Sequence, residues 1–406
     1  MAEAPLSGVR VLDFTWAWAG PFCTQTLAHL GAEVIRVETA ARTLCVTRLI
    51  PPFADDVPGP NRAGYFNQYN QGKRSILLNL RRPEAVELAY RLVPHCDVVA
   101  DNFAGGVMEK LGFGYEKLRG LKPDIIQISM SGYGQYGPFR RYIGYGPPAS
   151  ALSGLFWLTG YPGGDPAEIG VSYPDPNAGV MGAYAIIAAL IHRDLTGEGQ
   201  YIDQSQWEAV LVHMAEGLLE CDMNQIELAR NGNHDRFIAP HECYKSKGDD
   251  DKWISIVAAT DEEWRALCGA MGQPGLADDP RFKTNELRKK NEAALDAIIT
   301  GWTRERDRWE AAESLQRAGV AAYPSMNNKD LATDPHLIER GYLVQAEHPE
   351  VGRRIHAGIP WTMSETQCRV RHAAPVLGAD TDDVLRSLLG LSAQEIARLR
   401  EAEIVR

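Results

Sequence analysis

Apolar and polar positions follow two rhythms along the first half of this chain. Residues 9–14 and 33–38 are short runs rich in valine, isoleucine and leucine, which is typical of buried strands. Between such runs, 83–93 places its apolar side chains at helical spacing. Strands separated by helices form parallel sheets, because each helix carries the chain back to the edge where the next strand begins. The pattern predicts a large, open, Rossmann-like α/β domain.

The character of the sequence changes after residue 220. Turn-forming runs such as Asn231-Gly232-Asn233 flank short strand-like segments, and charged helical segments follow from about 261 to 316. Apolar runs return after Ala318, and a helical segment at 374–389 lies near the C-terminus. The predicted domain bounds are 1–220 for the first part of the large domain, 230–315 for a smaller α+β domain, and 320–406 for a return to the large domain.

Composition narrows the class of protein and its partners. The chain has 406 residues, 45% hydrophobic and 23% charged, with a net charge of −11. A negative field of this size argues against nucleic acid as a partner, and no apolar run approaches the roughly 20 residues that span a bilayer. We see no signal peptide pattern, and the seven cysteines form no CxxC pair. We expect a cytoplasmic protein with neither nucleic acid nor membrane as partner.

Two short motifs suggest ligands that their surroundings argue against. Residues 132–137 spell GxGxxG after a predicted strand, but prolines and glycines follow, whereas a dinucleotide site needs a helix there. We interpret this loop as the lining of a pocket. The second motif contains His234, His241, Glu242 and Cys243. Its spacing matches no zinc motif, so we predict no metal and no permanently bound cofactor.

Longer motifs occur in a fixed order along the chain. They are LSGVRVLD at 6–13, AGP at 19–21, LGAEVIRVE at 30–38, KRSI at 73–76, DNF at 101–103, SGYG at 131–134 and PVLG at 375–378. This order resembles family III CoA-transferases, the group that includes formyl-CoA transferase and α-methylacyl-CoA racemase. The resemblance implies a large and a small domain, an interlocked dimer of identical or paralogous subunits, and acyl-CoA and carboxylic acid substrates.

The segment SYPDPNAG at 172–179 matches the place of the family's nucleophile, so the resemblance implies that Asp175 is catalytic. A carboxylate can attack a thioester to give a mixed anhydride, which the released thiolate converts to an aspartyl-CoA thioester. From local sequence alone, simple N-capping is the better explanation of an aspartate before proline at the head of an apolar helix. The chain-wide resemblance favours the nucleophile.

The resemblance also implies a set of residues that bind CoA. The phosphates of CoA require cations and backbone donors. The matching positions are Ala19, Arg48, Lys73, Arg74, Asn102, Phe103, Lys110 and Tyr145. Lys110 stands where formyl-CoA transferase has an arginine, so it keeps the charge without the bidentate fork. Arg48 matches only if one inserted residue is allowed.

Aromatic residues are the candidates for the pocket that holds the acid. They are Trp16, Trp18 and Tyr173, together with Phe156 and Trp157. Such side chains accept an apolar or aryl group, although ordinary core packing is equally compatible with them. We therefore favour a substituted dicarboxylate such as an arylsuccinate as acceptor, with succinyl-CoA as donor.

Two other functions remain open at this point. The racemase branch has a histidine-aspartate pair where this chain has Tyr145 and Gly146, and a racemase needs a base on each face of the carbon. A CoA-transferring isomerase is still compatible with the sequence. A non-catalytic subunit of a heteromeric transferase is also compatible, but the presence of Asp175 counts against it.

Overall fold

The computed structural model describes residues 3–40, 43–248 and 251–406. The chain forms two compact units. The large unit comprises Met1–Phe156, Glu168–Ile226 and Pro335–Arg406, and the small unit comprises Trp157–Ala167 and Glu227–Asp334. The small unit thus takes residues 157–167 and 320–334, which the predicted bounds placed in the large domain. The reason for the second difference is strand β9 (Ala321–Pro324), which pairs with a strand of the small unit.

A six-stranded sheet forms the centre of the large unit, and all its neighbouring strands are parallel. In spatial order it contains β3 (Lys73–Leu77), β2 (Glu33–Glu38), β1 (Arg10–Asp13), β4 (Val98–Asp101), β5 (Ile126–Ser131) and β6 (Tyr201–Ser205). The chain builds outward from β1 in one direction and then from β4 in the other. In such sheets, ligands bind outside the carboxyl ends of the strands where the order reverses. The predicted α/β class is confirmed.

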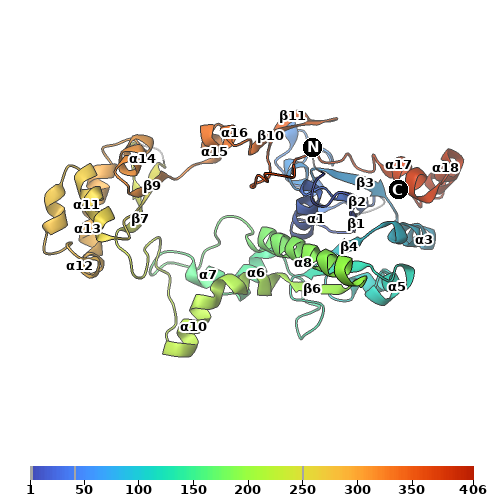
Figure 1. Cartoon of the computed structure of the whole chain (residues 1–406), viewed down its shortest axis with the longest axis horizontal. Coiled ribbons are helices and arrows are strands. Elements are labelled where there is room, and N and C mark those ends of the chain that lie inside the picture. The colour runs from blue at the N-terminus through green and yellow to red at the C-terminus, as the bar shows by residue number, and fades with distance from the viewer. Residues whose placement is uncertain (1–2, 41–42, 249–250) are drawn as a thin grey trace. The chain divides into compact units, whose positions relative to one another are not determined.

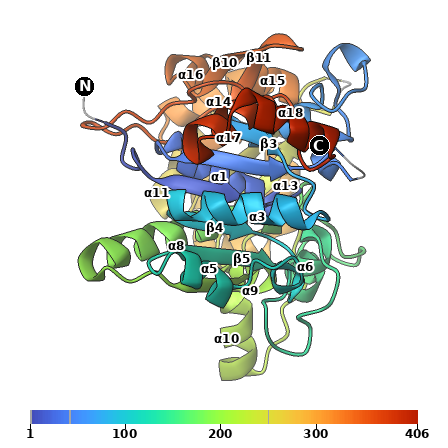
Figure 2. The same cartoon turned by 90° about the vertical axis from the view of Figure 1, so that its right-hand side faces the viewer.

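Helices cover both faces of this sheet, as the alternation of strand side chains requires. On one face, Val11 and Val34 pack against α1 (Ala19–His29) and α8 (Pro174–Thr196), which lie side by side (Figure 1). On the other face, Leu12 and Ile35 pack against α3 (Pro83–Leu92) and against α17 (Thr381–Leu389) and α18 (Ala393–Glu401). Figure 2 shows these three helices in front of the strands.

Shorter elements complete the large unit. They are α2 (Gly64–Tyr69), α4 (Val107–Lys110), α5 (Tyr115–Leu121), α6 (Gly146–Leu152), α9 (Gln206–Leu211), α10 (Ala215–Asn224), α16 (Pro335–Glu339) and the antiparallel pair β10 (Leu343–His348) and β11 (Gly352–Ala357). Helix α7 (Leu155–Leu158) spans the point in the sequence where one unit ends and the other begins.

Helix α8 is the one helix within the described ranges that is long and apolar enough to cross a bilayer. Its Ala183, Ile186 and Leu190 are buried in the core that it shares with α1 and the sheet. Packing inside the large unit therefore accounts for one apolar face of this helix, whereas Tyr184, Ile191 and Leu195 on the same helix are exposed.

The small unit has an α+β arrangement. Its antiparallel sheet runs in the order β7 (His241–Lys245), β8 (Trp253–Val257) and β9. The helices are α11 (Asp261–Ala270), α12 (Asn285–Lys290), α13 (Glu292–Thr303), α14 (Arg308–Arg317) and α15 (Asn328–Ala332). They form a separate core in which Trp264 and Leu267 meet Ile254 of the sheet. A capping box of Thr260 and Glu263 begins α11.

Candidate active site

Asp175 lies in the first turn of α8. Pro174 occupies the first helical position, Tyr173 is the N-cap residue, and no side-chain cap hydrogen bond is present there. Asp175 is therefore not the cap of this helix, and simple N-capping does not explain it. The unpaired N–H groups and the dipole of a helix N-terminus favour negative charge at this position.

The half-buried carboxylate of Asp175 is surrounded by hydrogen-bond donors. Burial raises the pKa of Asp175 above its ordinary value, and hydrogen bonding from Ser172, from Gln206 and from the backbone N–H groups of Ala19 and Gly146 acts in the opposite direction. The Ser172 hydroxyl donates to Oδ2 of the carboxylate. Donors placed around a carboxylate in this way can also stabilise the oxyanion that forms when it attacks a carbonyl.

Gly146 brings its backbone directly against this carboxylate. A Cβ atom at this position would lie 1.6 Å from the Ser172 Oγ and 2.2 Å from the Asp175 Oδ2. Every other residue would displace one of these groups. The preceding residue, Tyr145, is 64% exposed.

A close crossing of α1 and α8 brings their N-terminal ends together. At Gly179 of α8, a Cβ atom would lie 2.8 Å from the Ala19 carbonyl oxygen and 3.1 Å from the Cys23 nitrogen. At Gly182, a Cβ atom would lie 2.5 Å from the Met130 sulfur. The glycines let the helices approach closely enough for the first turn of α1, which begins at Ala19, to contact Asp175 at the first turn of α8.

An aromatic cluster lies beside Asp175. The Trp18 ring centroid is 5.5 Å from that of Tyr65 and 5.0 Å from that of Tyr69, and Phe22 contacts Tyr69 at 5.8 Å. We call Trp18, Phe22, Tyr65 and Tyr69 the Trp18 cluster. Burial raises the pKa of Tyr65, and the negative charge of Asp175 raises it further.

Of the other predicted pocket aromatics, Tyr173 is near the site and Trp157 falls in the small unit. The Tyr173 ring contacts His213 at 6.1 Å, and His213 Nε2 lies 2.9 Å from Asn177 Oδ1 on α8. Trp157 belongs to the small unit, where it stacks on Arg230 at 4.9 Å. Tyr65 and Tyr69 were missed by sequence reasoning, although their spacing of four residues in a helical segment puts both on one face.

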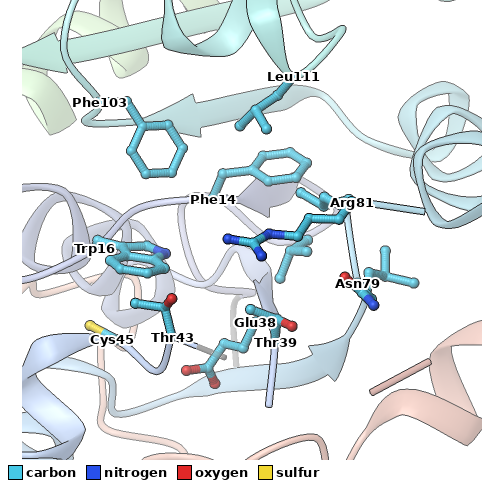
Figure 3. A pocket seen from close by; sticks show the side chains of 13 residues that line it. Phe14, Trp16, Glu38, Thr39, Thr43, Cys45, Asn79, Arg81, Phe103 and Leu111 are labelled. Carbon is cyan, nitrogen blue, oxygen red and sulfur yellow. The ribbon is translucent and has the colours of Figure 1, made fainter. Parts of the chain in front are cut away.

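A cavity of about 230 Å³ opens at the carboxyl ends of β1 to β4 (Figure 3). Its lining residues are Phe14, Trp16, Val37, Glu38, Thr39, Thr43, Cys45, Leu78, Asn79, Leu80, Arg81, Phe103 and Leu111. We call it the strand-end cavity. Trp16 and Phe103 meet edge to face at 6.4 Å. Figure 3 shows the Arg81 guanidinium reaching across the cavity below Phe14.

Three of the predicted CoA residues lie at or next to this cavity. Phe103 lines it directly. Asn102 holds the backbone of Trp16, since its Oδ1 accepts from the Trp16 nitrogen at 2.7 Å and its Nδ2 donates to the Trp16 oxygen at 2.8 Å. Lys110 is exposed at the end of α4, next to Leu111 of the lining.

Lys73 does not occupy a place where it could meet phosphate. Its ammonium is buried and lies 2.7 Å from Thr24 Oγ1, 2.9 Å from the Pro21 oxygen, 3.0 Å from Asn70 Oδ1 and 3.2 Å from Asp13 Oδ2. An ammonium has three protons to donate, so these partners use its capacity. Burial lowers the pKa of Lys73 to about 8. The prediction that Lys73 binds CoA is therefore corrected to a buried structural ion pair.

Arg48 and Arg74 are also committed to protein partners. The buried Arg48 forms a fork to Glu38, at 2.8 and 2.7 Å, and lies 3.5 Å over the Phe66 ring. Arg74 pairs with Glu33 at 2.7 Å, near the amino end of the sheet and away from the strand-end cavity, and also with Asp383. Because their acidic partners occupy these guanidinium groups, both CoA assignments are corrected as well.

Arg81 is the cation that sequence reasoning missed. It is exposed, it lines the strand-end cavity, and no bond to another side chain occupies its guanidinium among the described residues. The available signal was its place four residues after the strand β3, because the carboxyl ends of parallel strands face the ligand crevice.

The structure also shows what surrounds the glycine loop at 132–137 and the histidine motif around His234. The loop at 132–137 follows β5, lines a second cavity of about 240 Å³, and no helix begins before Gly146, so the pocket interpretation is confirmed. His234 Nε2 lies 2.9 Å from Asp296 Oδ2 and 3.3 Å from Glu242 Oε2 in the small unit. Within the described ranges, no group of three or more His, Cys, Asp or Glu side chains is arranged to hold a metal ion.

Comparisons with known proteins identify the family of this chain. The model of CoA-transferase family III matches residues 6–381. The chain is 34% identical over 411 residues to a succinyl-CoA–D-citramalate CoA-transferase of Chloroflexus aurantiacus, covering 99% of this chain and 98% of that one. The β subunit of a succinyl-CoA–L-malate CoA-transferase from the same organism is 32% identical, with coverages of 99% and 98%.

A solved structure has a fold similar to that of this chain. A CAIB/BAIF family protein from Brucella suis superposes with a TM-score of 0.85 and 31% identity, covering 95% of this chain and 100% of that chain. Because the family model and the relatives extend over almost the whole sequence, the chain belongs to CoA-transferase family III and is a CoA-transferase.

Proposed function

We propose that this enzyme moves CoA from succinyl-CoA to a second carboxylic acid, with Asp175 as the nucleophile. The observation that carries the proposal is the setting of the Asp175 carboxylate, which lies at a helix N-terminus among Ser172, Gln206 and two backbone N–H groups. The ionised carboxylate is the attacking form, and the same donors lower the energy of the oxyanion that its attack creates.

The reaction proceeds by four nucleophilic substitutions at acyl carbons. An Asp175 oxygen attacks the thioester carbonyl, the C–S bond breaks, and CoA leaves as thiolate from a mixed anhydride. The thiolate then attacks the Asp175 acyl carbon, which releases succinate and leaves an aspartyl-CoA thioester. The acceptor carboxylate attacks this thioester, forming a second anhydride and again freeing the thiolate. Attack of the thiolate on the acceptor's acyl carbon gives the new acyl-CoA and restores Asp175.

The strand-end cavity is the proposed site for the nucleotide part of CoA. Trp16 and Phe103 offer flat apolar surfaces to the adenine ring, while Arg81 and Lys110 supply positive charge for the phosphates. The pantetheine arm would then run from the cavity towards Ala19 and Asp175, with Tyr145 beside Gly146.

The Trp18 cluster supports an acceptor that carries a bulky apolar or aryl group. Trp18, Tyr65 and Tyr69 form a continuous aromatic wall beside the nucleophile. The relatives named above act on D-citramalate and L-malate, which are substituted four-carbon dicarboxylates. A substituted succinate such as an arylsuccinate combines both features and is our proposed acceptor class. A racemase or isomerase is less favoured, because Gly146 places backbone where the racemase branch has an acid-base side chain.

A second chain is the proposed partner of this one, either an identical copy or a paralogous subunit. On α8, Tyr184 is 73% exposed, Ile191 57% and Leu195 81%. Exposed apolar residues gathered on one helix are typical of a surface that another chain covers. The similarity to a named β subunit supports the paralogous case as the second option.

An exchange assay tests the catalytic proposal. The enzyme is mixed with succinyl-CoA and a panel of free acids that includes isotopically labelled succinate, and mass spectrometry follows CoA transfer. Asp175→Asn should abolish transfer, whereas Asp194→Asn, an exposed aspartate on the same helix, should not. Transfer that survives in Asp175→Asn would exclude this nucleophile.

A further inference from the structure

A buried polar network lies directly beneath the start of α1. The Asp13 carboxylate, at the end of β1, accepts hydrogen bonds from the Thr15 nitrogen at 2.8 Å, from Thr15 Oγ1 at 2.5 Å and from Thr24 Oγ1 at 2.8 Å. Lys73, from β3, donates to Thr24 Oγ1 at 2.7 Å and to the Pro21 oxygen at 2.9 Å. The side chains of Asp13, Thr15, Thr24 and Lys73 are all buried. We call these four residues the Asp13 network.

The network joins two strands to the first two turns of α1. Pro21 and Thr24 lie two and five positions after Ala19, where the helix begins. A buried carboxylate and ammonium hold their position tightly, because separating them would leave charges unpaired in a medium that cannot solvate them. The first turn of α1 is therefore fixed relative to the sheet.

The loop before α1 needs such an anchor. Ala17 has φ of 58°, a left-handed conformation that is strained for a non-glycine residue. Gly20 packs against Thr15 so closely that a Cβ atom would lie 2.4 Å from the Thr15 Cβ. The four residues between Thr15 and Gly20 thus form a tight turn held at both ends, and Ala19, whose N–H acts on Asp175, is part of it.

We propose that Asp13, Thr24 and Lys73 are positioning residues for catalysis, which hold the first turn of α1 so that the Ala19 N–H stays directed at the Asp175 carboxylate. This inference rests on the proposed role of Asp175 as nucleophile. None of the three touches substrate. They act through the backbone of α1. A variant that removes a hydrogen bond but keeps the side-chain volume therefore distinguishes this action from simple packing.

A second anchor in the same loop serves the other end of the substrate. Asn102 holds the backbone of Trp16 through both of its amide atoms, and Trp16 lines the strand-end cavity. The loop therefore has one anchor for the nucleotide site and another for the nucleophile. Loss of the Asp13 network, the anchor for the nucleophile, should slow the chemical step and leave CoA binding unchanged.

Thr24 offers the sharpest test, because valine keeps its volume and serine keeps its hydroxyl. The rate of label exchange between succinyl-CoA and succinate at saturation is measured for Thr24→Val, Thr24→Ser and Asp175→Asn, and CoA affinity is measured by titration with CoA alone. We expect Thr24→Val to lose roughly tenfold or more in the saturated rate, in line with the loss of one oriented backbone donor. Thr24→Ser should stay within about twofold, and all three should bind CoA like the unchanged enzyme.

The pH profile separates positioning from general loosening of the fold. In Thr24→Val the carboxylate loses the help of the Ala19 N–H, so the acid limb of the saturated rate should move to higher pH. The other groups that face Asp175, which are Ser172, Gln206, Tyr65 and the Gly146 backbone, are unchanged in this variant. A general loss of active protein would lower the whole profile without moving its limb.

The outcomes are distinguishable. A folded Thr24→Val with the unchanged rate and acid limb overturns the inference, as does an equal loss in Thr24→Ser. Full exchange in Asp175→Asn overturns the proposed function instead. If Thr24→Val does not fold, Thr15 provides the alternative test. Thr15→Val removes the other hydroxyl that donates to Asp13, and Thr15→Ser keeps it. The same criteria apply to this pair.

Discussion

Burial destabilises the ionised carboxylate of Asp175 in the folded protein, and the reactivity of this carboxylate depends on the destabilisation. Burial raises its pKa above the ordinary value of 3.8, so the folded protein disfavours the ionised form that attacks the thioester. Donors from four different positions offset part of this effect. A carboxylate that is less well solvated than in water is also a more reactive nucleophile, because less water must be removed before it attacks.

This balance predicts the pH dependence of the enzyme. Since catalysis needs ionised Asp175, activity should be lost as pH falls through its raised pKa, and the acid limb of kcat/KM should lie above 3.8. Because a raised pKa means that the charged carboxylate destabilises the fold at neutral pH, Asp175→Asn, which removes the charge, should raise the melting temperature there. Rates between pH 3 and 8 and thermal unfolding of both forms measure this. A melting temperature that falls in the variant contradicts it.

Arg81 and Arg82 form a matched pair for testing the nucleotide site. Arg81 lines the strand-end cavity, while Arg82 lies 3.9 Å from Glu84 and is about half exposed, at 49%. We expect Arg81→Ala to weaken CoA binding about tenfold or more through the loss of a phosphate contact, with a smaller salt dependence than the unchanged enzyme. Arg82→Ala should bind normally. Titrations with CoA at two ionic strengths decide, and equal affinity in both variants would remove Arg81 from the site.

Lys73 should behave as a structural residue. Replacement by alanine leaves the buried Asp13 carboxylate without its ammonium, and breaking a buried pair in this way costs about 3–5 kcal/mol. Chemical denaturation of Lys73→Ala should therefore show a large loss of stability. Arg74→Ala, whose partners are partly exposed, should lose about 1 kcal/mol or less. Similar losses in both variants would contradict the distinction between them.

At the scale of elements, the site exists because two helices start at the same place. The glycines of α8 allow the close crossing with α1, and Gly146 at the start of α6 closes the third side. Helices α1 and α6 contribute the backbone donors of Ala19 and Gly146. Such donors lose little freedom when the substrate binds, because the helices already hold them in place.

A single methyl group at Gly146 should therefore disable the site. It would overlap the Ser172 hydroxyl and the Asp175 carboxylate, and we expect Gly146→Ala to lower the transfer rate by about 100-fold or more through the displaced nucleophile. Gly120→Ala, where a Cβ atom meets nothing within 4 Å, is the control and should keep full activity. Exchange assays with circular dichroism as a check on folding test the pair. Normal activity in Gly146→Ala would show that the carboxylate tolerates displacement.

At the scale of the whole molecule, the exposed apolar residues of α8 remain to be covered. Leu195→Lys and Tyr184→Lys place charges on this surface and should weaken association of the proposed dimer, whereas Glu198→Lys, just beyond the helix, should not. Light scattering at low concentration measures the assembly. A dimer unaffected by both changes would place the subunit interface elsewhere.

The sequence by itself determined the class of the fold, because strand and helix periodicities are local properties that each segment carries alone. It also placed Asp175 at the head of an apolar helix, and the order of its motifs pointed to the family. Its domain bounds differed where β9 pairs with β8, because pairing depends on a partner strand 64 to 70 residues away.

Only the tertiary structure decided which cations are free to meet a ligand. Lys73, Arg48 and Arg81 look alike in the sequence, but the fold pairs the first two with acids. Asp13 is 60 residues from Lys73, and Glu38, ten residues from Arg48, comes within reach at the end of β2. The contact between the Trp18 and Tyr65 rings could not be predicted from the sequence for the same reason. Burial and pairing are properties of the assembled core, and a charged group is available to substrate only when the fold has left it without a partner.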